Sequence, residues 1–153
     1  MTPTPRPAQA GEPPRRVVLD TNVSLALFLW EDPACAALSA EIQSQRLQPI
    51  LDLPCLDEWQ RVLASLSDLT VERRARATSF YHRHLELVAT PGLTLTLPRC
   101  RDPDDQKFLH LAAGAGASAL YTRDQDLLRL HGQARRRLAL QIVHPEDCRA
   151  ESA

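Results

Sequence analysis

The sequence predicts an α/β fold in which a parallel β-sheet of four to five strands is sandwiched between layers of α-helices. Short apolar runs alternate along the chain with longer segments whose apolar residues recur at helical spacing. Such alternation is typical of strand–helix–strand units, whose parallel sheet is covered on both faces. Acidic residues also follow two of the apolar runs, at the edge where ligands bind in folds of this class.

Five short apolar runs are the predicted strands. The first carries the letters VVL between two arginines and a polar turn, as expected for a buried strand that ends at its last apolar residue. In the third, leucine alternates with threonine, which is typical of a strand with one covered face. The predicted strands span residues 16–19, 50–53, 93–97, 119–122 and 138–143.

The segments between these strands are predicted helices. Thr21 or Asn22 suits the cap of the first helix, and Thr70 suits the cap of the fourth. Pro91 and Gly92 are expected to end that fourth helix. Its expected inward residues are Val71, Ala75, Phe80 and Leu87. The predicted helices cover residues 23–30, 33–45, 54–66, 70–89, 107–117 and 126–130.

The length of 153 residues fits one domain. Residues 1–14 are proline-rich and are expected to form a disordered tail, residues 15–146 the folded domain, and residues 147–153 a loose C-terminal tail. No apolar run approaches the roughly 20 residues that span a bilayer, so no membrane association is expected. Four widely spaced cysteines and no secretion signal predict reduced thiols in the cytoplasm.

The charge pattern argues against a protein that grips nucleic acid by bulk positive charge, because the formal net charge is only −1. Two arginine clusters are either local basic patches or solvated helix faces. They lie at residues 73–76 and 135–137.

Four acidic residues stand at or near the ends of apolar segments and are the candidate catalytic and metal-binding residues: Asp20, Glu58, Asp105 and Asp124. Carboxylates that converge repel one another unless cations or protons neutralise them. Mg²⁺ and Mn²⁺ prefer oxygen ligands and are held by carboxylates together with substrate phosphates. Such ions orient a water and stabilise a phosphodiester as it is cut, so hydrolysis of a nucleic-acid backbone is the implied reaction.

Each of these acids also has a structural explanation when taken alone. Asp20 and Asp124 suit helix caps or turns, Asp105 suits the first turn of a helix, and Glu58 suits a surface pair with Arg61. Two polar neighbours, Asn22 and Thr122, are candidates to orient a carboxylate or a bound water, or else they satisfy only local backbone.

Four strings in this order, VVLDTN, DEWQRVL, DPDDQKFLHLA and LYTRDQDLL, resemble the PIN domain, in particular its VapC-like branch of toxins from toxin–antitoxin systems. The resemblance covers residues 15–146. It implies a Rossmann-like three-layer fold and a ribonuclease that uses Mg²⁺ or Mn²⁺. Matched by position, the four acidic ligands of the family fall on Asp20, Glu58, Asp105 and Asp124, with Asn22 and Thr122 at the accompanying polar positions.

Some assignments within this resemblance stay open. Asp102 or Asp104 replaces Asp105 as the ligand if the helix starts a residue or two earlier, and Asp126 is a lesser rival of Asp124. Arg123 stands where this branch often has glycine, and it is expected to place a cation near the substrate phosphate.

The resulting hypothesis is a cytoplasmic endoribonuclease that acts on an RNA substrate, with an antitoxin partner and a homodimer expected from the resemblance alone. The rival is a catalytically silent module of the same fold that binds RNA or protein. A haloacid-dehalogenase-type phosphatase would need a second aspartate at Asn22, and a response-regulator receiver would need a partner lysine outside the acidic motif that holds Lys107.

Overall fold

The structure, a computed structural model, describes residues 12–93 and 96–148. Five parallel strands form one sheet in the order β3-β2-β1-β4-β5. This confirms the predicted α/β class with a parallel sheet. The strands are β1 Arg15–Leu19, β2 Leu47–Leu51, β3 Glu86–Leu87, β4 Ala119–Tyr121 and β5 Gln141–Val143.

Every connection between strands that was predicted to contain a helix does contain one. The helix α7 was not predicted. The α-helices are α1 Thr21–Phe28, α2 Ala36–Gln43, α3 Leu53–Ser65, α4 Val71–His84, α5 Gln106–Gly114, α6 Gln125–Leu128 and α7 His131–Leu138. Three 3-10 turns, η1 Pro33–Cys35, η2 Pro103–Asp105 and η3 Pro145–Asp147, complete the described elements.

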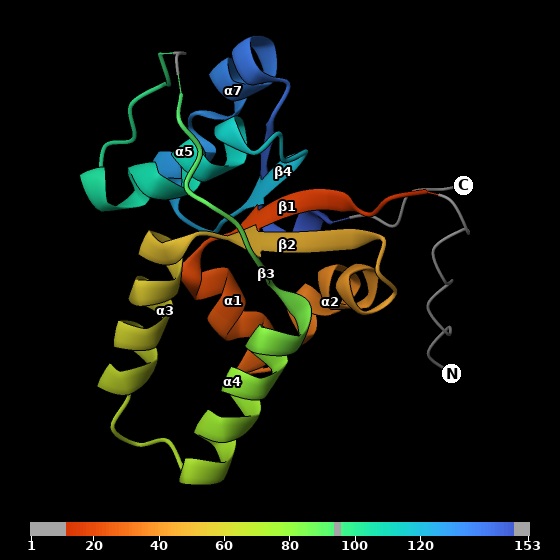
Figure 1. The fold of residues 1–153 in the computed structure, drawn as a ribbon, viewed down its shortest axis with the longest axis vertical. Helices are drawn as coiled ribbons and strands as arrows, with labels where there is room; N and C mark the ends of the chain where they lie inside the picture. The colour runs from red at the N-terminus through yellow and green to blue at the C-terminus, as the bar shows by residue number, and fades with distance from the viewer. Residues whose placement is uncertain (1–11, 94–95, 149–153) are drawn as a thin grey trace.

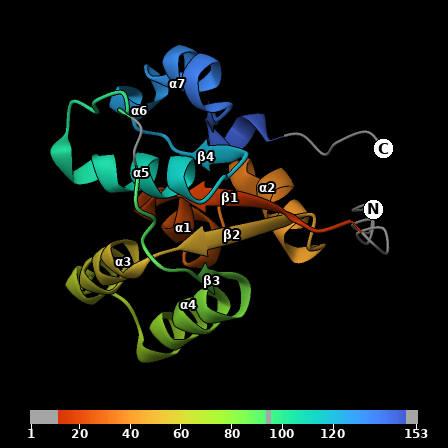
Figure 2. The same cartoon turned by 45° about the horizontal axis from the view of Figure 1, so that its top comes forward.

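The sheet separates two groups of helices. Figures 1 and 2 show α5 and α7 on one side of the sheet and α1, α3 and α4 on the other. This division follows from right-handed crossovers, because the chain first moves outward from β1 through β2 to β3 and then returns to the opposite side for β4 and β5. The direction of travel reverses between β1 and β4, and that is the point where ligands bind in open parallel sheets.

Side-chain caps fix where several helices begin. Asp20 caps α1 by accepting a hydrogen bond from the backbone N–H of Val23 at 2.8 Å, so the predicted cap at Thr21 or Asn22 was wrong by one or two residues. Asp52 caps α3 in the same way, and Thr70 caps α4 as predicted. The strand predicted at 50–53 therefore ends at Leu51, before the Asp52 cap.

The α4 region differs most from its prediction. The helix ends at His84 rather than at Pro91, because the chain turns into β3, which pairs with β2 through Ile50 and Leu51. The residues of α4 that face the core are Ala77 and Tyr81. The expected inward residues are not buried: Val71 is 80% and Leu87 54% exposed, Ala75 is exposed and Phe80 is half-buried.

The predicted strand at 93–97 falls partly on residues 94 and 95, which lie outside the described residues. Its described residues, Leu93, Thr96 and Leu97, are not in a strand. Pro91 in this connection packs on α5: its carbonyl contacts His110 Nε2 at 2.6 Å. The prediction of a strand from 138 was also too early, because α7 runs to Leu138 and β5 begins at Gln141.

The core lies on both faces of the sheet and includes Val17, Val18 and Leu120 from its central strands. All four cysteines are buried and free. At the C-terminal end, η3 covers Pro145–Asp147, and Cys148 is buried. The tails predicted at 1–14 and 147–153 lie largely outside the described residues, which exclude 1–11 and 149–153.

Within residues 12–93 and 96–148, no single helix has the length and apolar character needed to cross a membrane. Thr21–Phe28 and Pro33–Gln43 meet those two criteria only when they are taken together, across a bend of 103°.

Candidate active site

Asp20 and Thr122 lie side by side at the carboxyl end of the two central strands. The register of β1 and β4 pairs Leu19 with Tyr121, so the residue that follows each strand reaches the same edge. Thr122 is fully buried, and its hydroxyl donates a short hydrogen bond to Asp20 Oδ2. The same hydroxyl accepts from the backbone N–H of Asp124 at 3.0 Å. Thr122 therefore joins two of the predicted acids.

Asp20 is 6% exposed, and its carboxylate is held from both sides. Burial raises the pKa of Asp20 above its ordinary value, while the hydrogen bonds from Thr122 and Val23 act in the opposite direction. The negative charges of Asp124 and Glu58 add to the rise. Asp20 is therefore close enough to both Asp124 and Glu58 to be repelled by their charges.

Glu58 reaches the same region from α3. Both of its carboxylate oxygens have partners: Thr21 donates a short hydrogen bond to Oε2, and the Lys107 ammonium donates to Oε1 at 2.8 Å. Lys107 also donates to the carbonyl of Asp104 at 2.6 Å. Among the four predicted acids, Glu58 is thus the one that pairs directly with a basic side chain of the described residues.

Asp105 and Asp124 face each other from η2 and the start of α6. Burial, followed by the hydrogen bond with Asp124 and its charge, raises the pKa of Asp105 to about 7. The hydrogen bond from Asp105 in turn lowers the pKa of Asp124. The proximity of Asp124 therefore favours the protonated form of Asp105.

All four acids line one cavity of about 220 Å³. Thr21, Asn22, Val62 and Phe108 complete its walls. The oxygen donors match the preference of Mg²⁺ and Mn²⁺. Burial and, after it, the charges of neighbouring acids raise the pKa values of Asp20 and Asp105, and a bound cation would favour their ionised forms. In the described part of the chain, however, no three His, Cys, Asp or Glu side chains are grouped as metal ligands. The donor chemistry fits a divalent cation, while the present side-chain positions serve hydrogen bonds instead.

Of the other predicted site residues, Asn22 lines this cavity, whereas Asp102, Asp104, Arg123 and Asp126 do not. Asp102 caps η2 through a 2.9 Å bond from the Asp104 N–H, and both residues are exposed. Asp126 pairs with Arg129 at 3.6 Å. Arg123 does not point to the acids: its guanidinium donates to Asp32 Oδ2 at 2.8 Å. Among the rivals for the third acid, only Asp105 lines the cavity.

Two side chains at the site, Thr21 and Lys107, were not among the predicted site residues. Thr21 was considered only as a helix cap, yet the cap is Asp20 and the Thr21 hydroxyl instead bonds Glu58. Lys107 is the only lysine of the chain and stands two residues after Asp105. That isolated lysine inside an acidic motif was the available signal.

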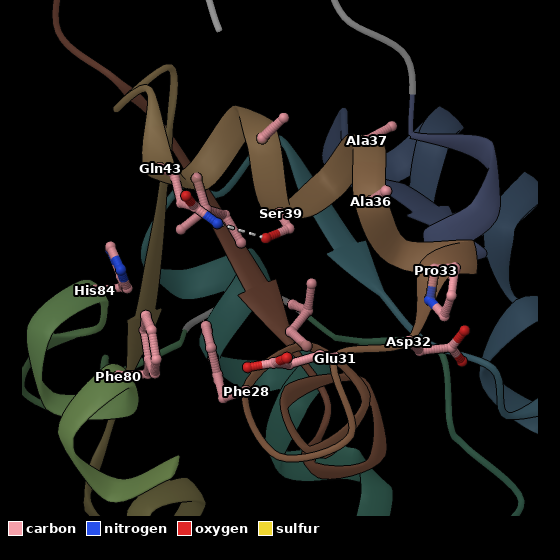
Figure 3. Close-up of a pocket in the computed structure, with 13 residues that line it drawn as sticks. Phe28, Glu31, Asp32, Pro33, Ala36, Ala37, Ser39, Gln43, Phe80 and His84 are labelled. Carbon is pink, nitrogen blue, oxygen red and sulfur yellow. Dashed lines mark hydrogen bonds between the residues drawn. The ribbon is translucent and has the colours of Figure 1, made fainter. Parts of the chain in front are cut away.

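A groove of about 770 Å³, larger than the acidic cavity, lies between α1, α2 and α4, away from the four acids of that cavity. Figure 3 shows Phe28 and Phe80 on one side and α2 on the other, with Ser39 and Gln43 joined by a 2.9 Å hydrogen bond. Asp32 lines this groove and also holds Arg123, which lies between Thr122 and Asp124. The groove and the acidic cavity are therefore separate, and they share no lining residue.

Comparison with known proteins agrees with this architecture. No curated protein matches the chain. Among solved structures, it is similar to one described as VapBC2 from Rickettsia felis bound to a DNA fragment from their promoter, with a TM-score of 0.56 and 13% identity over 84% of this chain and 98% of the other. At that identity the similarity concerns the fold alone. The PIN domain family matches residues 16–126, a stretch that includes all four cavity acids, and the protein therefore belongs to the PIN domain family.

Proposed function

We propose that the protein is a metal-dependent endoribonuclease that hydrolyses RNA phosphodiester bonds at the acidic cavity. One observation carries the proposal: carboxylates from four separate segments of the chain line a single cavity at the point where the sheet order reverses. A purely structural role does not explain four acids around one hollow, because their mutual repulsion costs stability. Membership of the PIN domain family supports this assignment.

The chain's own residues would position the reaction. Asp20, Glu58, Asp105 and Asp124 would hold Mg²⁺ or Mn²⁺, which supplies an activated water and stabilises the charge that grows on the phosphodiester. Thr122 fixes the carboxylate of Asp20 and the backbone of Asp124 at once. Asn22 is exposed at the cavity wall, where its amide would orient a water or a phosphate oxygen.

Cleavage of a mixture of transfer and ribosomal RNA by the purified protein tests this proposal. We expect products with Mn²⁺ and none with EDTA. Asp20→Asn should lower the rate by more than about a hundredfold, since losing only the outer partners of a ligand costs about 10- to 100-fold. Residual cleavage that is equal in wild type and Asp20→Asn would indicate a contaminating nuclease and contradict the assignment.

A silent binding module remains a second candidate, and one observation favours it: both oxygens of Glu58 are already bonded within the protein. The binding module and the nuclease predict different results in the same cleavage and RNA-binding experiments. RNA binding that is equal in wild type and Asp20→Asn, together with no Mn²⁺-dependent cleavage by either, would support the module.

We further propose that the protein is the toxin of a type II toxin–antitoxin pair and acts in the cytoplasm. The solved structure of similar fold is described as VapBC2, which supports a partner of this kind. The groove between α1, α2 and α4 is the surface we assign to that antitoxin, because its apolar wall would bury an apolar segment. An open reading frame for a small DNA-binding protein beside the gene would support the assignment, and a free-standing gene would contradict it.

A further inference from the structure

Lys107 is engaged with the acidic site in a way that the proposed chemistry does not use. It lies in the first turn of α5, and its ammonium is shared between Glu58 Oε1 at 2.8 Å and the Asp104 carbonyl at 2.6 Å. The side chains of Lys107 and Glu58 are only 21% and 19% exposed. An ion pair with that little solvent is screened less by salt than a fully exposed surface pair.

The contacts with Thr21 and Lys107 occupy both carboxylate oxygens of Glu58. With Thr21 on one oxygen and Lys107 on the other, the carboxylate turns its favourable acceptor positions toward protein donors. A divalent ion needs those same positions. The pairing gives a physical reason why the four acids share a cavity although, among the described residues, no group of three is arranged as metal ligands.

The other acids of the cavity differ from Glu58 in this respect. Asp20 accepts from a backbone N–H and a hydroxyl, neither of which carries a charge. Asp105 has another acid, Asp124, beside it. In the part of the chain that the structure describes, Lys107 is thus the basic side chain that balances the negative charge of the cavity.

We propose that the Lys107 ammonium is a resident counter-cation, which stands in for a divalent ion at Glu58 when no metal is bound and yields that carboxylate when metal binds. The Asp104 carbonyl keeps the displaced ammonium at the rim of the cavity. Lys107 is then a positioning residue that tunes metal affinity, and it stabilises the metal-free fold. The inference rests on the proposed function, because it requires that the acids bind a cation.

Variants of Lys107 separate this role from a merely structural one. Lys107→Met keeps the length of the side chain and removes its charge, and Lys107→Arg keeps the charge. In EDTA, we expect Lys107→Met to unfold at lower urea concentration than wild type. In Mn²⁺ titrations by calorimetry, we expect it to bind roughly three- to tenfold tighter, because no ammonium competes for Glu58. Lys107→Arg should behave like wild type in both measurements.

Arg129→Met is the matched control, since it removes an exposed cation paired with Asp126, outside the cavity. It should leave Mn²⁺ affinity unchanged. A loss of stability in Lys107→Met with unchanged Mn²⁺ affinity would mean a structural role and would overturn the proposal. Equal Mn²⁺ binding in all variants would overturn it too, whereas no Mn²⁺ binding even by wild type would contradict the proposed function along with it.

Chemical labelling tests the same step in the unmutated protein. Because the chain has one lysine, an acetylating reagent has only Lys107 and the α-amino group as amine targets. Saturating Mn²⁺ should raise the acetylation rate of Lys107 severalfold relative to the α-amino group, as read by mass spectrometry. An unchanged or lower ratio under conditions in which calorimetry shows bound Mn²⁺ would overturn the displacement.

Discussion

Thr122 is the residue on which the geometry of the acidic cavity depends most directly. It is fully buried, donates to Asp20 and accepts from the Asp124 backbone. Thr122→Val keeps the shape and removes both bonds, so we expect a loss of about 1–3 kcal/mol in the free energy of unfolding, together with about 10- to 100-fold slower RNA cleavage. Urea unfolding and single-turnover cleavage measure these effects. Thr122→Ser retains the hydroxyl and should lie close to wild type in both.

Asp105 makes the stability of the metal-free protein depend on pH. Its pKa is raised to about 7 in the fold, above the ordinary value of 3.8, so folding favours the protonated form. This contribution is full below about pH 4 and is lost as the pH rises toward and through 7. In EDTA, we therefore expect the urea midpoint of wild type to fall between pH 5 and 8.

The matching variant is Asp105→Asn, which has no proton to lose. Its midpoint should fall less steeply over the same range, with the remaining slope coming from Asp20, whose pKa is raised as well. Identical slopes for wild type and Asp105→Asn would show that Asp105 ionises freely and that the pair with Asp124 does not hold a proton.

Asp20, Asp124 and Arg123 show which features of single residues can be predicted from the sequence and which cannot. Asp20 and Asp124 directly precede helices, so their positions at a strand end follow from local patterns, and each also caps its helix. Arg123 was predicted to face the substrate because it adjoins Asp124. Its actual partner, Asp32, is 91 residues away along the chain. No local pattern reports such a contact, because Asp32 lies between α1 and η1 whereas Arg123 lies between β4 and α6.

At the scale of elements, the packing of the Pro91 segment against α5 allows a direct test. A Cβ on Gly114 would lie 2.4 Å from Pro91 Cγ and 2.5 Å from its Cβ, far inside contact distance. Gly114→Ala should consequently cost about 1–3 kcal/mol of unfolding free energy, as other overpacked sites do. Thermal or urea unfolding measures the change.

Gly132→Ala is the control for this substitution, because it lies in α7 and its nearest new contact is the flexible end of Arg136 at 3.5 Å. There alanine should stabilise by about 0.5–1 kcal/mol through helix propensity alone. If Gly114→Ala stabilised by the same amount, the close packing of Pro91 on α5 would be refuted.

The elements that were predicted well are those with strong local signals. β1 and β4 are short apolar runs bounded by polar turns, and α3 has a clear apolar stripe and a proline in its first turn. β3 has only two residues, both exposed, and forms because β2 offers it an edge. The helical spacing of apolar residues in α4 continues past His84 in the sequence. Only the pairing of β3 with β2 reveals where that helix ends.

At the scale of the whole molecule, the groove between α1, α2 and α4 and the acidic cavity share no lining residue, so we expect the proposed partner binding and the proposed catalysis to be separable by mutation. Phe80 lines the groove, whereas its neighbour Ser79 is exposed and does not. Phe80→Glu places a charge in the apolar wall and should weaken binding of the proposed antitoxin by at least about tenfold, since burying an unpaired charge costs more than about 1.4 kcal/mol. Ser79→Glu adds the same charge outside the groove and should leave the affinity unchanged, and both variants should cleave RNA at the wild-type rate when no partner is present.

Calorimetric titration with the purified antitoxin measures the affinities. Equal weakening by the two substitutions would point to long-range charge, and no weakening by either would place the antitoxin on another surface.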